Sequence, residues 1–288
     1  MKTNSKSITE IIKFRSSCRT FSSKLLTKEN KKKITDILKN TNLTSPFNEE
    51  KQNCRFEIVE LENKGTDEKR KLGTYGFIKG ANQFIIGITR RSKFVKEEFG
   101  YIFEKLILDF TKQGFGTCWL GGTFNRSNYA KTVNIEDNEF ILCISPIGIP
   151  ADSRRLSEKI IRRAIKAKKR KNWNVLFFEE NIANPLTEIS AGKYAIPLEM
   201  VRLAPSGGNK QPWRILKEKD KNIFHFYWIM GKSMSYNKIH KVDMGIAVCH
   251  FDLMVKELGL KGNWIIEQES PSKFDKFKYV ITWNGEYE

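Results

Sequence analysis

The sequence predicts a protein of the α/β or α+β class, with helices and strands mixed throughout its 288 residues. Two observations support this prediction. Apolar runs of buried-strand length interleave with segments of helical periodicity, and the two parts of the chain share landmarks in the same order. Hydrophobic residues make up 40% of the chain, which is enough for a sizeable core and too much for a disordered polyelectrolyte.

Periodicity and turn residues predict the elements in order. A helix is expected to begin near Thr27 and to include Ile34–Leu38. Further helices are expected at 93–113, 154–171 and 241–258, and Gly114 and Gly259 are suited to end the first and the last of these. Strands are expected at 56–60, 83–88, 140–148, 214–216, 223–228 and 279–283. Between Asn172 and the later strands lies a stretch marked by Pro and Gly.

An internal repeat decides the predicted architecture. A shift of 159 residues pairs Pro46 with Pro205, Lys51 with Lys210, Gln52 with Gln211 and Arg55 with Arg214. Further along the chain, a shift of 145 residues pairs Gly100 with Gly245, Leu108 with Leu253, Gly114 with Gly259 and Trp119 with Trp264. The alternative is chance matching of common helix-turn residues. The order and context of the pairs favour a diverged duplication. We therefore expect two related halves, residues 1–165 and 166–288, intertwined in one globular unit.

Basic residues are in excess, with 51 Lys and Arg against 33 Asp and Glu, which gives a formal charge of +18. Ten of them lie between Arg154 and Lys171, where Leu156, Ile160, Ile161, Ala164, Ile165 and Ala167 recur at helical spacing. This pattern favours a solvated surface helix whose basic residues lie opposite its apolar face. Nucleic-acid binding through this helix is the alternative.

The chain shows none of the sequence signals of a membrane or secreted protein. No window approaches the roughly 18 to 20 apolar residues of a spanning helix, and the polar N-terminus lacks the apolar region of a secretory signal. The cysteines are odd in number, scattered and without CxxC spacing: Cys18, Cys54, Cys118, Cys143 and Cys249. We expect reduced thiols in a cytoplasmic protein, without zinc.

Three segments have the composition of a binding site. RSSCRTF (15–21) places two guanidinium groups four residues apart with hydroxyls between them, which suits an anion, although such strings also occur on plain surfaces. APSGGNKQPWR (204–214) presents amides and glycines to a flat polar ligand. GFGTCWLGG (114–122) carries four glycines, which indicates close backbone approach to something flat or a tight turn packed by Trp119.

Together these three segments resemble the signature segments of the nitroreductase family of flavin proteins. The resemblance implies a nitroreductase-like α+β fold with central mixed and antiparallel sheets flanked by helices. In ordinary members one subunit carries all three segments, and an obligate homodimer builds two FMN sites at its interface. The Arg/Ser segment and the GTCWLGG turn come from one subunit, and the APSGxNxQ loop comes from the other.

This chain departs from that pattern. APSGGNKQPW occurs only in the second half, and its first-half counterpart, 45–52, has Asn48 and Glu49 in place of the two glycines and Glu50 in place of the asparagine. RSSCRTF and GTCWLGG occur only in the first half. The resemblance therefore implies a fused, internally duplicated pseudo-dimer with one FMN site per chain built from both halves. Such a chain needs no partner subunit and is expected to be a monomer.

The resemblance also assigns roles to residues. Arg15, Ser16, Ser17 and Arg19 are expected at the FMN phosphate and ribityl end, joined by Lys168 and Arg170 after the last strand of the first half. Cys118, Trp119, Leu120, Gly121 and Gly122 are expected beside the ring, with the Gly121 amide facing flavin N5. Pro205, Ser206, Asn209 and Gln211 are expected to close the site, and Thr74 to contact the pyrimidine edge.

No catalytic side chain is expected, because the flavin carries the hydride. Cys118 is either a reactive thiol or a small filler between glycines, and the filler is favoured. His225, His240 and His250 are too far apart to suggest a metal set. The expected activity is ping-pong reduction of nitroaromatic or quinone-like acceptors by NADH or NADPH. A flavin-binding storage or sensor protein without turnover is the second hypothesis, and a nucleic-acid binder is the third.

Overall fold

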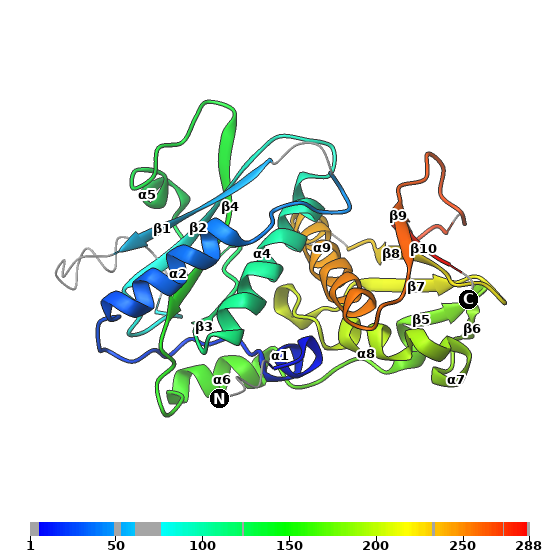
Figure 1. The fold of residues 1–288 in the computed structure, drawn as a ribbon, viewed down its shortest axis with the longest axis horizontal. Coiled ribbons are helices and arrows are strands. Elements are labelled where there is room, and N and C mark those ends of the chain that lie inside the picture. Colours follow the sequence, from blue (N-terminus) through cyan, green and yellow to red (C-terminus); the bar gives the residue numbers. More distant parts are fainter. Residues whose placement is uncertain are drawn as a thin grey trace.

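Two β-sheets lie on either side of a pair of crossed helices in the computed structural model (Figure 1). The structure describes residues 6–48, 53–60, 76–122, 124–231, 234–272 and 274–286. The arrangement confirms the predicted α+β class with mixed and antiparallel sheets.

The helices and strands have the following bounds. The helices are α1 (Ile8–Phe14), α2 (Lys28–Asn40), α4 (Val95–Lys112), α5 (Arg126–Ala130), α6 (Leu156–Ala164), α7 (Glu188–Ala191), α8 (Ala195–Leu203) and α9 (Met234–Glu257). The strands are β1 (Cys54–Glu60), β2 (Gln83–Arg90), β3 (Gly116–Thr117), β4 (Glu139–Gly148), β5 (Phe177–Glu179), β6 (Asn181–Pro185), β7 (Trp213–Lys217), β8 (Ile223–Ile229), β9 (Gly262–Ile265) and β10 (Phe277–Gly285).

The two sheets repeat one topology. The first has the strand order β1-β2-β4-β3, and the second contains the run β7-β8-β10-β9, with every pair in both runs antiparallel. In each run the central helix, α4 or α9, connects the second strand to the strand that lies last in the order. The second sheet continues through β5, which pairs parallel to β7, to β6. The duplicated architecture expected from the paired landmarks is therefore present in the strand order.

Gly100 and Gly245, one of the predicted pairs, lie where α4 crosses α9. A Cβ on Gly100 would lie 2.1 Å from the carbonyl oxygen of Val242, and one on Gly245 would lie 1.9 Å from that of Glu97. Each glycine thus faces the residue three positions before the other, which is the reciprocal contact of a two-fold interface. The backbones can approach this closely only because neither residue has a side chain.

Local sequence explains the ends and the burial of the main elements. Gly114 and Gly259 follow the two central helices with φ of 84° and 66°, a conformation that glycine adopts without strain. The Thr27 side chain accepts a hydrogen bond from the Asn30 amide and begins α2. The continuous apolar run at 83–88 forms β2, which is buried from Gln83 to Thr89. One hydrophobic core spans both halves, including Phe99 and Phe103 of α4 and Val248 and Phe251 of α9.

The basic segment differs from its prediction. The helix expected over 154–171 ends at Ala164, and Lys166 has a positive φ of 51°. Only part of its predicted apolar face is covered. Leu156 and Ile160 are exposed, whereas Glu158 is buried and accepts a hydrogen bond from the Thr20 hydroxyl at 2.7 Å. The reason is that α6 packs on the polar segment 16–20, so its carboxylate faces inward.

The stretch after Asn172 contains more regular structure than its Pro and Gly residues suggested. It forms β5, β6, α7 and α8 before β7 begins. Pro197 lies in the first turn of α8, where a missing backbone N–H removes no intrahelical hydrogen bond. Proline therefore did not mark an irregular segment here.

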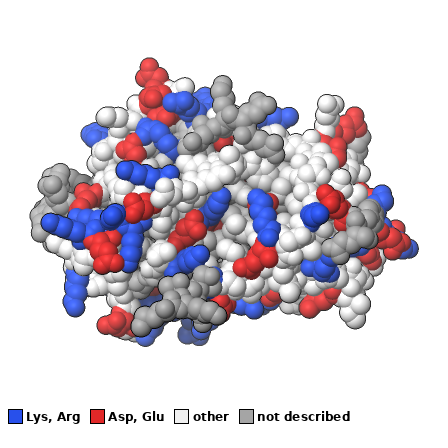
Figure 2. Space-filling view, in the orientation of Figure 1, with Lys and Arg blue, Asp and Glu red and all other residues white. Residues whose placement is uncertain are grey.

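The described helices include none that is long and apolar enough to cross a membrane. Lys and Arg side chains are intermixed with Asp and Glu over the face shown in Figure 2. The excess of positive charge therefore does not form a single-sign patch on that face.

We expect Gly245→Ala and Gly100→Ala each to lower the free energy of unfolding by about 1 to 3 kcal/mol, because the added methyl group meets a helix backbone. Urea denaturation of the purified variants measures the loss. Gly122→Ala is the control, since its Cβ would have no neighbour within 4 Å. Equal stabilities for Gly245→Ala and Gly122→Ala would contradict the close crossing.

Candidate functional site

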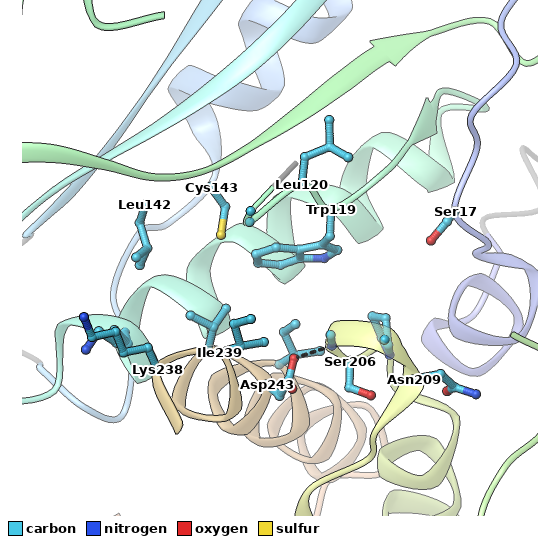
Figure 3. A pocket seen from close by; sticks show the side chains of 18 of the residues that line it. Ser17, Trp119, Leu120, Leu142, Cys143, Ser206, Asn209, Lys238, Ile239 and Asp243 are labelled. Atoms are coloured by element: carbon cyan, nitrogen blue, oxygen red, sulfur yellow. Dashed lines mark hydrogen bonds between the residues drawn. The ribbon is translucent and has the colours of Figure 1, made fainter. Parts of the chain in front are cut away.

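A cavity of about 1580 Å³ opens between the two halves. The first half contributes residues of segments 13–19 and 119–122, and the second half contributes loop residues 205–209 and one face of α9. Figure 3 shows the Trp119 indole on one side of the cavity and Ile239, Asp243 and Ser206 on the other. The segments that the sequence singled out in separate halves therefore meet around one space.

The Arg/Ser segment reaches the cavity because it runs beside β3. Helix α1 ends at Phe14, and the Cys18 amide donates to the Thr117 carbonyl at 2.8 Å. Ser17 and Thr117 form a parallel bridge at the same place. This pairing fixes the backbone between Arg15 and Arg19, and both residues line the cavity.

Guanidinium groups crowd this end of the cavity. Arg15, Arg19, Arg162 and Arg170 all line it, and the Arg162 side chain donates to the Ser17 carbonyl at 3.4 Å. Burial and then the charge of Arg15 lower the pKa of Arg170 to about 10. The buried Nη1 of Arg19 and Nε of Arg170 have no hydrogen-bond partner among the described residues. Unpaired buried donors on crowded cations indicate a site for an anion.

The glycine turn after β3 gives the cavity an open wall. Leu120 exchanges backbone hydrogen bonds with Ile144 at 2.9 and 3.0 Å, which fixes the turn to β4. A Cβ on Gly121 would meet only the Cys143 sulfur, at 3.4 Å, and one on Gly122 would meet nothing within 4 Å. The backbone here is accessible to a flat ligand.

The second-half loop is held by its own polar side chains. The Ser206 hydroxyl accepts from the Gln211 amide at 2.9 Å. The Asn209 side chain donates to the carbonyls of Lys166 and Lys169 at 2.8 and 2.9 Å. Arg170 in turn donates to the Asn209 side-chain oxygen at 3.2 Å. The loop therefore fixes the segment after α6 and places the Arg170 guanidinium at the cavity.

The structure brings most of the predicted site residues together. Those that line the cavity are Arg15, Ser16, Ser17, Arg19, Trp119, Leu120, Gly121, Gly122, Arg170, Pro205, Ser206 and Asn209. Thr74 lies outside the described residues.

Three predicted residues are placed away from the cavity wall. Cys118 is buried in an apolar cluster, and burial raises the pKa of its thiol, as a filler role requires. Gln211 is buried, and its side-chain oxygen accepts from the Lys171 amide at 2.7 Å. Lys168 is exposed and is not among the lining residues. Of the two basic residues expected after the last strand, Arg170 is the one at the cavity.

From the sequence we expect the helix at 241–258 to cover the pocket, which the lining residues of α9 agree with, but sequence reasoning named no individual lining residue of α6, β4 or α9. Arg162, Cys143, Lys238, Ile239 and Asp243 all line the cavity. On α9 the lining positions recur at helical spacing, and Asp243 is a lone acid among apolar residues there. That pattern is the one signal in the sequence that could have identified Asp243.

Asp243 is buried at the cavity, with only one of its carboxyl oxygens bonded. Its Oδ1 accepts from the Gly207 amide at 2.9 Å, while Oδ2 has no partner among the described residues. Burial raises the pKa of Asp243 to about 8, and the Gly207 hydrogen bond opposes that shift. The carboxyl therefore joins the loop to α9, and burial holds its pKa well above the usual value for an aspartate.

We expect Asp243→Asn to change how stability depends on pH. The folded pKa of about 8 lies above 3.8, the usual value for an aspartate. The wild type is thus most stable with this carboxyl protonated and loses stability as pH rises toward 8. Denaturation between about pH 5 and about pH 9 should show a steeper fall for the wild type than for the variant. The exposed Asp137→Asn variant serves as control, and parallel curves for the wild type and Asp243→Asn would contradict the raised pKa.

Comparisons with known proteins relate the whole chain to one family. A family model named "Putative TM nitroreductase" matches residues 7–255. A crystal structure of a "putative nitroreductase" from Thermotoga maritima matches with a TM-score of 0.59 and 19% identity, covering 98% of this chain and 95% of that chain. None of the curated proteins compared with the chain matches it.

Two solved structures that match about half of this chain are also nitroreductase-like. A nitroreductase family protein from Clostridium novyi is 20% identical over 53% of this chain and 92% of its own, with a TM-score of 0.41. A protein from Bacteroides thetaiotaomicron, described as a "Putative NADH dehydrogenase/NAD(P)H nitroreductase", is 19% identical over 51% of this chain and 89% of its own, with a TM-score of 0.41. Because the family model matches residues 7–255, the chain belongs to the nitroreductase family that this model describes, "Putative TM nitroreductase".

Proposed function

We propose that the chain is an FMN-dependent oxidoreductase that uses NADH or NADPH to reduce nitroaromatic or quinone-like acceptors. One flavin site per chain is built from both halves. The observation that carries the proposal is the cavity at which Arg15, Arg19, Trp119 and Ser206 meet, because these residues come from the three segments that resemble the family's flavin-binding signatures.

The cation-rich end of the cavity fits the phosphate of a mononucleotide. Arg19 and Arg170 each have a buried nitrogen without a partner among the described residues, which a phosphate oxygen can satisfy. Ser16 and Ser17 line the same end and offer hydroxyl groups. Binding an anion there offsets the repulsion among the guanidinium groups.

The glycine turn fits the ring. Gly121 and Gly122 leave the backbone open, and Trp119 lines the cavity beside them. When bound, FMN supplies the hydride transfer, and the protein supplies binding, orientation and electrostatics. Across the cavity, Ile239 and Val242 of α9 present apolar surface that excludes water from the ring.

The rest of the cavity suits a second, anionic molecule such as a nicotinamide dinucleotide. Arg91, Lys96 and Lys238 also line it, and Figure 3 shows Lys238 on the opposite side of Trp119 from Ser17 and Asn209. Burial and the charges of Lys241 and Lys238 lower the pKa of Lys96. An anionic group at this end would relieve that repulsion, and the donor and acceptor would occupy this space in turn, as ping-pong exchange requires.

The composition of the site bears on the oligomeric state and the location of the protein. Both halves of the site are present in one chain, so no partner subunit is needed and a monomer is proposed. All five cysteines are free thiols, in keeping with the proposed cytoplasmic location. The guanidinium groups of Arg162 and Arg170 line the flavin cavity, so part of the basic segment has a function other than nucleic-acid binding.

We expect the purified protein to be yellow and to release about one FMN per chain on denaturation. Under anaerobic conditions NADH or NADPH should remove the visible flavin absorption band, and a quinone should restore it. A colourless protein that ignores added FMN would contradict the proposed cofactor. Full FMN occupancy without loss of the band would contradict turnover and leave a flavin-binding protein.

Residues from both halves should contribute to FMN affinity. Arg19→Gln removes a first-half guanidinium, and Asn209→Ala releases the second-half contacts that place Arg170. Each is expected to weaken FMN binding roughly tenfold or more, because a charge-assisted contact is worth about 1.5 to 3 kcal/mol. Fluorescence titration measures it, with the exposed Arg163→Gln of α6 as control. If Arg19→Gln weakens FMN binding and Asn209→Ala does not, the proposal that both halves build the site is wrong.

A further inference from the structure

A fully buried carboxylate lies directly behind the cavity and contacts two of its lining residues. Glu104 is on α4, and its Oε2 accepts from the Trp119 indole N–H at 2.7 Å. Its Oε1 lies 3.7 Å from Nε of Arg15 and 3.0 Å from Nε2 of His250 on α9. The side chains of Glu104 and His250 are both 0% exposed. Glu104 thus links Trp119 and Arg15, which line the two ends of the cavity, to His250 on α9 of the second half.

The hydrogen bonds of His250 fix where its protons lie. Nδ1 is 2.9 Å from the Met200 carbonyl oxygen, which only accepts, so Nδ1 carries a hydrogen. The contact between Nε2 and Glu104 then needs one further proton between the two atoms. That proton gives either an imidazolium with a carboxylate or an imidazole with a carboxylic acid. In both forms the pair has no net charge.

A neutral pair leaves the charge of Arg15 uncancelled. Arg15 has a side chain that is 7% exposed, and Glu104 is the acid recorded beside it. Without the shared proton, the pair would carry a net negative charge beside Arg15 and would offset the charge of that guanidinium. With it, no net negative charge of the pair offsets the positive charge of Arg15 at the cavity. Arg15 lies close enough to Arg170 and Arg162 to lower the pKa of both, although burial is the largest cause of each shift.

The second half contains a similar tryptophan–carboxylate contact, in which a tyrosine and a lysine contact the carboxylate in place of the histidine. Trp264, the counterpart of Trp119, donates to Oδ1 of Asp252 on α9 at 2.8 Å. Tyr101 of α4 donates to Oδ2 of the same carboxylate at 2.5 Å, and burial and the Asp252 charge raise the pKa of Tyr101 so that it stays protonated. Lys256 supplies the compensating charge at 2.7 Å. A tryptophan–carboxylate contact therefore occurs in both halves, although the shift of 145 residues pairs Glu104 with Cys249 and not with Asp252. Of the two carboxylates, Glu104 is the one that contacts Arg15 and His250.

We propose that Glu104 and His250 are a positioning pair for the phosphate end of the flavin site. Glu104 orients Arg15 and Trp119, and the proton that it shares with His250 keeps the Arg15 charge available to a phosphate. The inference rests on the proposed function and adds a role for two residues that do not touch the ligand.

The test compares FMN with riboflavin, which has the same ring and no phosphate. His250→Gln keeps a donor for Glu104 but can neither carry the charge of an imidazolium nor share a proton with the carboxylate, so the carboxylate charge would offset that of Arg15. We expect FMN affinity to fall about tenfold while riboflavin affinity stays within about twofold. In Glu104→Gln/His250→Gln the carboxylate charge is absent, and the preference for FMN is expected to return. Fluorescence titration of the full-length chain measures both ligands.

Tyr101→Phe is the matched control, because it breaks a contact between α4 and α9 at the other buried carboxylate, Asp252. It is expected to lower the urea midpoint and to leave the ratio of the two affinities unchanged. Equal losses for FMN and riboflavin in His250→Gln, or a double variant that does not regain the preference, would overturn the positioning role. If His250→Gln does not fold, His250→Asn in the presence and absence of Glu104→Gln gives the same comparison.

The outcomes also separate this proposal from the proposed function. A wild-type chain that binds neither flavin would overturn both. A wild-type preference for FMN that persists in His250→Gln would overturn the positioning pair alone and leave the flavin site in place.

Discussion

The close crossing of α4 and α9 at Gly100 and Gly245 is the constraint on which the rest of the structure depends. Each glycine faces the backbone of the opposite helix, so the two helices share a core that neither half could complete alone. The crossing also sets where the two sheets lie relative to each other (Figure 1). Because α9 reaches the cavity through this contact, the wall formed by Ile239 and Asp243 exists only when both halves are docked.

The cation cluster at the cavity shows how a binding site can work against stability. Arg162 and Arg170 have lowered pKa values because they are buried near other guanidinium groups. Such crowding is unfavourable until an anion compensates it. A ligand that binds only the folded chain would return that free energy by mass action. In the proposed function the flavin phosphate has this role, and the unbound protein is correspondingly less stable.

Duplication has preserved the scaffold and changed the polar residues. Asp243 and Glu98 occupy matching positions on α9 and α4. Both are buried carboxylates that accept backbone hydrogen bonds, from Gly207 and Asn53 respectively. Burial raises the pKa of each. Only Asp243 is among the residues that line the described cavity. The two acids therefore make similar backbone contacts, and the residues around them differ between the halves.

The sequence by itself determined the two central helices, the main strands of both sheets and most of the residues that line the cavity. It could do so because strands such as 83–88 and the glycine turn at 114–122 are specified by contiguous residues. Only the tertiary structure decided that Glu158 of α6 is buried while Leu156 is exposed, because the surface that α6 covers is polar. The same holds for Asp243, Glu104 and His250. Their roles depend on which residues from distant loops and helices the fold brings within hydrogen-bond distance, and periodicity along a single chain does not contain that information.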